Sequence, residues 1–252
     1  MNWRVKIQKP LRKWKLDLLL HGPGPRAARV SAAVDEIIER ARRDEKAGFR
    51  RDQWLFGFES EFEEISDEIA HLKDIGETDA YKELYGKLYA FAADTMADSY
   101  MPLYLYILYR YASALLETGE AEHALQLFEK LYAGTERLIG IRNPYGIHCL
   151  EVMVKAAVQC GQAEKAERAL QEMYEIAKED FGPYSAMTLA VLRYTAESKD
   201  ALGAAADSEA AAAPASALKD AKKARGELYR KCRILLGDEH PVTARFRKEY
   251  AG

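Results

Sequence analysis

The chain has 252 residues, of which 48% are hydrophobic and 31% charged, as is ordinary for a folded soluble protein. This length allows one or two compact domains, or a single elongated one. No stretch approaches the roughly 18 apolar residues of a membrane-spanning helix, which excludes a protein anchored by such a span. Ala, Leu, Glu, Lys and Arg are abundant and proline is scarce, so the composition favours helix over strand.

The net charge of −3 is unevenly distributed along the chain. Residues 1–51 carry 14 Lys and Arg against 6 Asp and Glu, whereas the remainder carries 23 against 34. Either this basic region folds back on an acidic body, or it contacts RNA or an anionic membrane. The sequence leaves both interpretations open.

The first 25 residues form a basic arm that ends in the helix-breaking cluster His21-Gly22-Pro23-Gly24-Pro25. Two tryptophans in so polar a segment indicate docking, either onto the body of the protein or onto a partner. The candidate docking residues of the arm are Trp3, Arg12, Lys13 and Trp14.

Three cysteines, Cys149, Cys160 and Cys232, lack the spacing of a metal site. The first two lie about 16 Å apart along one predicted helix, too far for a disulfide, so free thiols in a reducing compartment are expected. We therefore expect an intracellular protein, cytoplasmic in the first place, with a mitochondrial or other organellar location as the alternative.

Residues 26–97 are predicted to be helical. Helices are expected at 31–47, 52–75 and 79–97. Ser31 is the expected N-cap of the first helix, and Gly76 ends the second. The second and third helices have the spacing of a diverged first repeat.

From Pro102 onward the sequence repeats itself every 42 residues. Glycine recurs at this spacing in Gly119, Gly161 and Gly203, and alanine follows in register at Ala124 and Ala166. Self-similarity at such a period is typical of a solenoid built from helical hairpins. Each hairpin is predicted to turn at its glycine, because glycine readily adopts the left-handed conformation of such turns.

The third repeat is longer than the other two. Gly119 to Gly140 and Gly161 to Gly182 each span 21 residues, whereas Gly203 to Gly237 spans 34. We place the extra residues in an Ala-rich run at about 204–216 and expect an inserted loop. A last helix, starting near Pro241, is expected to cap the stack.

The turn residues resemble those of the 42-residue variety of tetratricopeptide (TPR) repeat found in kinesin light chains. The matching pieces are Gly119-x4-Ala124, Gly161-x4-Ala166, Ile139-Gly140-x2-Asn143-Pro144 and Leu236-Gly237-x2-His240-Pro241. The resemblance covers about residues 98–252. It implies an all-α fold, namely a right-handed α-solenoid of about three to four TPR-like hairpins with an N-terminal helical extension and a C-terminal capping helix. The expected segments are 1–25, 26–97 and 98–252.

The resemblance also implies a concave wall formed by the first helix of each hairpin. Kinesin light chain repeats place an Asn there, which grips a peptide backbone. Arg110, Val152 and Tyr194 stand at the corresponding positions, and a valine side chain can neither donate nor accept a hydrogen bond. Peptide capture in that manner is therefore not expected.

A concave face would still display a stripe of aromatic and charged side chains. The candidate partner-binding residues are Tyr106, Arg110, Ser113, His148, Val152, Lys155, Tyr194 and Glu197. Tyr and Arg are enriched in the hot spots of protein interfaces. The alternative interpretation is a solvated helix face, and most other tyrosines between 100 and 111 are expected to be packing residues.

Catalytic, cofactor-binding and metal-binding motifs are absent from the sequence. The five histidines do not cluster at ligand spacing, and neither His-Glu-x-x-His nor Cys-x-x-Cys occurs. We expect no cofactor, no metal and no catalysis. Two functions remain: a scaffold or adaptor that binds another protein, or a subunit of a large organellar or ribonucleoprotein complex anchored by its basic arm.

Overall fold

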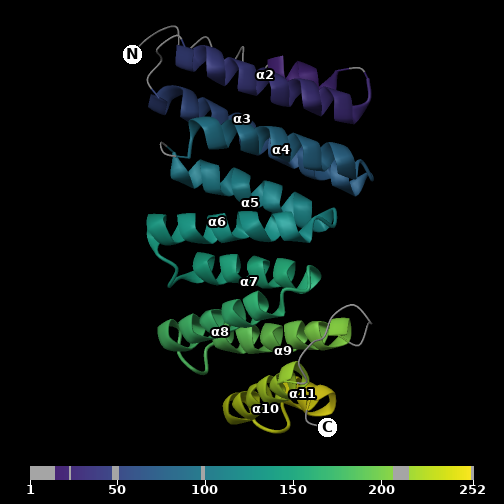
Figure 1. The fold of residues 1–252 in the computed structure, drawn as a ribbon, viewed down its shortest axis with the longest axis vertical. Coiled ribbons are helices and arrows are strands. Elements are labelled where there is room, and N and C mark those ends of the chain that lie inside the picture. Colours follow the sequence, from purple (N-terminus) through teal and green to yellow (C-terminus); the bar gives the residue numbers. More distant parts are fainter. Residues whose placement is uncertain (1–14, 23, 47–50, 98–99, 207–215, 251–252) are drawn as a thin grey trace. The chain divides into compact units, whose positions relative to one another are not determined.

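The computed structural model describes residues 15–22, 24–46, 51–97, 100–206 and 216–250. The chain divides into two compact units, Met1–Glu120 (unit 1) and Ala121–Gly252 (unit 2). Within the described ranges, all regular secondary structure is helical (Figure 1). The segment boundaries expected after residues 25 and 97 stay a prediction.

Unit 1 is a stack of helices with one apolar core. A helical segment over 15–21 precedes α2 (Arg26–Lys46), α3 (Arg51–Asp74), α4 (Thr78–Thr95) and α5 (Met101–Glu117). Each of these four helices packs against the next, and α2 also contacts α4. The largest fully buried side chains include Phe62, Tyr85 and Phe91. α3 and α4 form a hairpin that turns at Gly76, and its assignment as a diverged first repeat stays a prediction.

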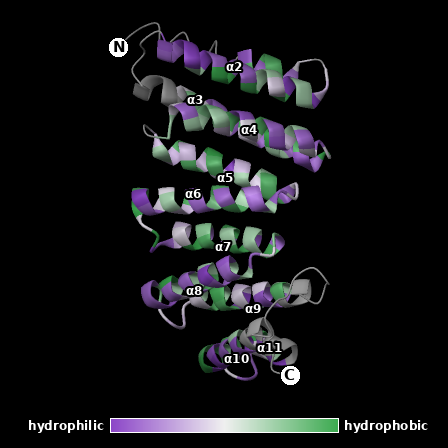
Figure 2. Cartoon of the chain, viewed as in Figure 1, coloured by the Kyte–Doolittle hydropathy of each residue, from purple (hydrophilic) through white to green (hydrophobic). Residues whose placement is uncertain are grey.

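Unit 2 continues the same pattern of helices. It comprises α6 (Ala121–Ile139), α7 (Pro144–Gln159), α8 (Ala163–Asp180), α9 (Ala186–Ala206), α10 (Ser216–Leu236) and α11 (Pro241–Tyr250). Each helix packs on the next, and α7 also contacts α9, as the first helices of adjacent hairpins do in a solenoid. Figure 2 shows hydrophobic and hydrophilic residues interleaved along α6, α7 and α8, since each has both a buried and an exposed face.

Gly119 and Gly161 of the 42-residue repeat, and Gly76 of the preceding hairpin, end their helices in the same way. Gly76, Gly119 and Gly161 have φ values of 88°, 89° and 71°. In each case the amide after the glycine donates to the carbonyl five residues earlier over 2.8 Å. This is the Schellman motif, which requires a left-handed residue at the glycine position. The repeated glycine is therefore a repeated backbone turn.

Gly203 departs from this rule, and the turn expected there is wrong. α9 continues through Gly203 as far as Ala206. Alanine is the best helix former, so the run at 204–206 offsets the cost of about 1 kcal/mol for one glycine within a helix. Part of the expected insertion is therefore helix, Ser216 begins α10, and residues 207–215 lie outside the described part of the chain.

The N-cap expected at Ser31 is also wrong. α2 begins at Arg26, directly after Pro25, and the Arg29 amide donates to the Pro25 carbonyl over 3.2 Å. The segment from Arg26 to Arg29 consists of strong helix formers, which extend the helix toward the proline. Among the described residues, no helix combines the length and the apolar character needed to cross a bilayer.

Candidate functional site

The candidate binding residues lie on three helices. Tyr106, Arg110 and Ser113 belong to α5 in unit 1; His148, Val152 and Lys155 to α7, and Tyr194 and Glu197 to α9, in unit 2. The arm residues Trp3, Arg12, Lys13 and Trp14 lie outside the described residues. The two units are therefore considered separately.

Arg110 is anchored within unit 1. Its Nε and Nη2 atoms donate to the Tyr85 hydroxyl over 2.9 and 2.5 Å. That hydroxyl is buried between α4 and α3, where it donates to the Ser66 carbonyl oxygen over 3.0 Å. Burial raises the pKa of Tyr85, so the phenol stays neutral and accepts from the guanidinium. Arg110 thus ties α5 to α4.

Tyr106 is more exposed than the other tyrosines of α5. It is 43% exposed, and its ring meets Phe62 of α3 edge-on at 5.5 Å. Other tyrosines of α5 pack, as expected: the Tyr89 ring stacks on both Tyr104 and Tyr111. Ser113 is half-buried. Among the described aromatic side chains of unit 1, Tyr106 is exposed and the others are buried or half-buried.

In unit 2, Tyr194 joins α9 to α7. Its hydroxyl donates to the backbone carbonyl oxygen of Glu151 over 3.0 Å. Burial raises the pKa of Tyr194 to about 12, which keeps the phenol a neutral donor at physiological pH. The position that carries a peptide-gripping Asn in the resembled repeats therefore makes a contact between helices of this chain.

The surface formed by α7 and α9 carries charges of both signs around half-buried Val152. The Nδ1 atom of His148 lies 3.4 Å from Glu151 Oε2, and this hydrogen bond lowers the pKa of the Glu151 carboxyl. Glu197 lies 3.6 Å from Arg193, and Lys155 is exposed. We call His148, Glu151, Val152, Lys155, Tyr194 and Glu197 the α7–α9 face.

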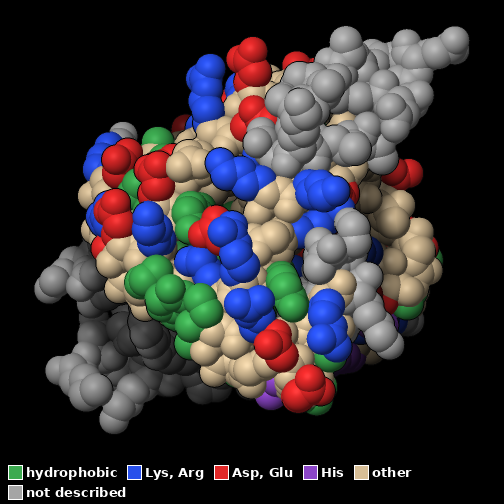
Figure 3. Space-filling model, turned by 90° about the horizontal axis from the view of Figure 1, so that it is seen from below, with side chains coloured by type: hydrophobic (Ala, Val, Ile, Leu, Met, Phe, Trp, Pro, Cys, Tyr) green, Lys and Arg blue, Asp and Glu red, His purple; other side chains and the backbone are tan. Residues whose placement is uncertain are grey.

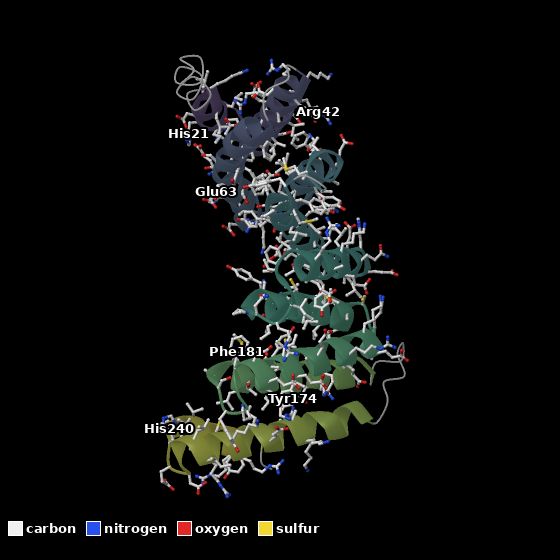
Figure 4. The ribbon with its side chains drawn as sticks, turned by 90° about the vertical axis from the view of Figure 1, so that its left-hand side faces the viewer. His21, Arg42, Glu63, Tyr174, Phe181 and His240 are labelled. Carbon is white, nitrogen blue, oxygen red and sulfur yellow. The ribbon has the colours of Figure 1, made fainter. Side chains whose placement is uncertain are left out.

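Sequence reasoning missed a cavity of about 380 Å³ between α8, α9 and α10. Its lining is mostly polar and includes Tyr174, Thr195, Lys199, Lys223 and Glu227. The Tyr174 hydroxyl donates to Glu227 Oε1 over 2.6 Å, and burial raises the pKa of Tyr174 to about 12 (labelled in Figure 4). No pattern predicted this cavity, because it depends on where α10 packs after the insertion.

The described part of the basic N-terminal region is largely paired within unit 1. Lys15 lies 2.8 Å from Glu36, Arg26 lies 2.7 Å from Glu68, and Arg40 pairs with Glu61. Arg42 lies over the Phe91 ring at 5.9 Å. Arg26 and Arg40 thus pair with carboxylates of α3, whereas Lys15 pairs within the basic region itself, and the interpretation in which the region folds back on the acidic body stays a prediction.

Metal-ligating side chains do not cluster within the described ranges. No group of three or more His, Cys, Asp or Glu side chains there is placed to hold a metal ion. Cys149 is buried and burial raises its pKa, which leaves the thiol a poor nucleophile. What the α7–α9 face can do chemically is make polar and apolar contacts with another surface.

No protein-family model and no curated protein matches the sequence. The structure is similar to the TPR-like repeats of a kinesin light chain from Podosopora anserina, with a TM-score of 0.58 and 16% identity over 92% of this chain and 97% of that one. A variant of that protein gives a TM-score of 0.57, with 17% identity over 92% and 95% of the two chains. The fold is therefore an all-α solenoid of TPR-like repeats, as the turn residues predict.

Proposed function

We propose that the protein is a non-enzymatic protein-interaction scaffold or adaptor that binds its partner through the α7–α9 face. The observation that carries the proposal is the arrangement of this face on a TPR-like fold. Its helices are joined by the hydrogen bond from Tyr194 to Glu151, so the face is formed before any partner arrives. A preformed surface loses less conformational entropy on binding.

The chemistry of the face supports recognition of side chains rather than of an extended backbone. Val152 offers an apolar centre, and the Tyr194 hydroxyl is already engaged by a carbonyl of this chain. Around them Lys155 and Glu197 present opposite charges to solvent. The partner that fits is a helix or folded surface with an apolar residue flanked by charges of both signs.

Affinity capture with the immobilised full chain, read by mass spectrometry, tests this proposal. Lys155→Glu reverses one charge on the face, and Lys130→Glu makes the same change at an exposed position on α6. A partner retained by the wild type and by Lys130→Glu should be reduced at least about tenfold by Lys155→Glu, which corresponds to about 1.4 kcal/mol. Equal capture by all three proteins would refute the assignment of the face.

The basic N-terminal region supports a second candidate, a subunit of a large complex held by the arm. Residues 1–51 keep an excess of positive charge, and part of it is used by ion pairs such as Arg26 with Glu68. Under this proposal, deletion of residues 1–14 releases the protein from a fast-sedimenting fraction of a cell extract, whereas Lys155→Glu does not. A truncated chain that still co-sediments would count against it.

A further inference from the structure

The last two helices of unit 2 are basic, although the chain that precedes them is acidic. Residues 216–250, which comprise α10 and α11, carry 10 Lys and Arg against 5 Asp and Glu, whereas residues 52–215 carry 13 against 29. The last repeat of a solenoid needs a polar outer face for solubility, but charges of both signs meet that need. The excess of positive charge at this end therefore indicates a polyanionic partner.

Four exposed basic residues share one face of α10. They are Lys222, Lys223, Arg230 and Arg233, and we call them the α10 basic face. Their spacing of i, i+1, i+8 and i+11 places them within about a third of the helix circumference and along about 16 Å of its axis. The acidic residue between them in sequence, Glu227, lies off this face, where it is half-buried and accepts from the Tyr174 hydroxyl of α8. The exposed charges of the face are thus all positive.

The fold uses little of this charge. Lys222, Lys223 and Arg230 form no ion pair with a carboxylate in the described part of the chain, and Arg230 Nε donates to a backbone carbonyl one turn earlier over 3.2 Å. Arg233 Nε lies 3.9 Å from Asp238, but both side chains are more than half exposed, so water screens this pair. The α10 basic face can therefore still bind anions.

Exposed apolar side chains directly follow the basic face at the end of α10. Ile234, Leu235 and Leu236 are 66%, 44% and 42% exposed, and we call them the α10 apolar end. Figure 3, which views the α10–α11 end of the chain, shows Lys and Arg side chains gathered across its middle with hydrophobic side chains beside them. A contiguous group of exposed apolar side chains beside such charge marks an interaction surface.

This combination favours a lipid surface over other polyanions. Phosphates of a nucleic-acid backbone offer aliphatic side chains no favourable contact, and Tyr229, the aromatic residue nearest to Arg230, is half-buried rather than free to stack on bases. Successive residues of a helix point about 100° apart, so a rigid protein surface could cover only part of the α10 apolar end. Fluid acyl chains can surround all of it.

We propose that the α10 basic face and the α10 apolar end bind the surface of an anionic membrane. The basic side chains lie against anionic lipid headgroups, and Ile234 and Leu235 enter the boundary between headgroups and acyl chains. Binding is peripheral and reversible, and each basic residue near the surface strengthens it about fivefold, or about 1 kcal/mol. This site shares no residue with the α7–α9 face and goes beyond the proposed scaffold function.

Co-sedimentation of the full chain with lipid vesicles tests the proposal. The wild type should bind vesicles of phosphatidylcholine that contain phosphatidylserine, but not vesicles of phosphatidylcholine alone, and binding should weaken as salt is added. Lys222→Gln combined with Arg230→Gln should reduce the affinity about thirtyfold, at about fivefold for each charge. Ile234→Ser should reduce it several-fold, because it removes apolar surface from the contact.

Two double variants are matched controls. Lys130→Gln with Arg137→Gln removes the same charge from exposed positions on α6 and should keep the affinity within about twofold of the wild type. Lys222→Arg with Arg230→Lys keeps the charge of α10 and should bind as the wild type does. All the substituted side chains are exposed, so thermal melting should show unchanged stability.

A chain that lacks residues 1–14 separates this site from the basic N-terminal arm. Lys222→Gln with Arg230→Gln should weaken vesicle binding of the truncated chain by the same factor as in the full chain. Binding that is lost with residues 1–14 and does not respond to the substitutions on α10 overturns the proposal.

Three further outcomes overturn it. One is a wild type that does not bind phosphatidylserine vesicles, and another is an equal loss of binding in the α10 and α6 double variants. The third is a wild type that binds polyuridylate but not vesicles and loses the RNA in the α10 double variant, which would make nucleic acid the polyanion. Vesicle binding that Ile234→Ser leaves unchanged overturns the role of the α10 apolar end.

Discussion

The Arg110 guanidinium on α5 donates two hydrogen bonds to the Tyr85 hydroxyl on α4, although the sequence predicts Arg110 as a partner-binding residue. Tyr85 is 0% exposed and reaches its remaining partner, Ser66, on α3. One phenol therefore connects three helices of unit 1. Loss of Arg110 would affect folding as well as any binding, so binding assays on this residue need a stability control.

Arg110→Ala should lower the free energy of unfolding by about 1.5–3 kcal/mol, the contribution of hydrogen bonds from a charged donor. Urea denaturation followed by circular dichroism measures the change. Arg137→Ala, at an exposed position on α6, should stay within about 0.5 kcal/mol of the wild type. Equal effects of the two substitutions would show that the Arg110–Tyr85 contact contributes nothing.

Lys231 should prove essential for the attachment of α10. Its ammonium is buried, donates to the Pro183 carbonyl over 2.6 Å and lies 5.3 Å from the centre of the Tyr184 ring. Lys231→Met keeps the length of the side chain but removes the charge. Amide hydrogen exchange in α10 should then accelerate more than in α7. The exposed neighbour Arg230, changed to Met, should leave the exchange of α10 as it was.

Thr188 and Thr243 occupy equivalent positions, six residues after Gly182 and Gly237, but should respond differently to substitution. Thr188 Oγ1 lies 2.7 Å from the Gly182 carbonyl oxygen and 2.9 Å from that of Ala177. Thr243 Oγ1 is buried with no hydrogen-bond partner among the described residues.

Thr188→Val should therefore cost about 1–2 kcal/mol of unfolding free energy, whereas Thr243→Val should be neutral or stabilising. Thermal or chemical denaturation distinguishes the two. A larger loss for Thr243→Val than for Thr188→Val would contradict the hydrogen-bond assignment.

Alkaline pH should weaken the fold through three half-buried tyrosines. Burial raises the pKa of Tyr104, Tyr174 and Tyr194 to about 12, from an ordinary value of 10.0. The folded state therefore holds these protons more tightly than the unfolded state does. Their contribution to stability is complete below pH 10 and is lost as the pH rises toward 12.

Denaturation measured at several pH values between 9 and about 12 checks this linkage. In parallel, phenolate absorbance should show that these tyrosines ionise at a higher pH than exposed tyrosines do. Tyr194→Phe should flatten the fall in stability with pH, because it removes one of the groups that titrate. An unchanged dependence of stability on pH in that variant would contradict the raised pKa of Tyr194.

The hairpin architecture could be predicted from the sequence because its turns are local. A Schellman turn is encoded within a few residues of Gly76, Gly119 or Gly161, and the structure has the motif at all three. The turn predicted at Gly203 is wrong for an equally local reason, since the alanines that follow it favour helix. The N-cap predicted at Ser31 is wrong because strong helix formers lie between Ser31 and Pro25 and extend the helix.

The candidate site was less predictable because it depends on contacts between helices. The helical spacing predicts which face of its helix carries Arg110 or Tyr194. It does not predict the residues on other helices to which these side chains hydrogen-bond. A signal did exist for one of them, because Tyr85 recurs with Tyr81, Leu84 and Leu88 at the spacing of one helical face, and a buried phenol needs a hydrogen-bond partner. Which residue would reach it depends on how α5 packs on α4.

Asn143, Ser185 and His240 share one position in the repeat and use an amide oxygen, a hydroxyl and an imidazole to accept a backbone amide. The requirement at this position is for an acceptor of the right reach, not for a particular amino acid. Many sequences can therefore satisfy the same turn, and repeats of this chain can diverge in identity while their helices keep their spacing. A search that scores hydrogen-bonding capacity at caps and turns would find such repeats where a search on identity does not.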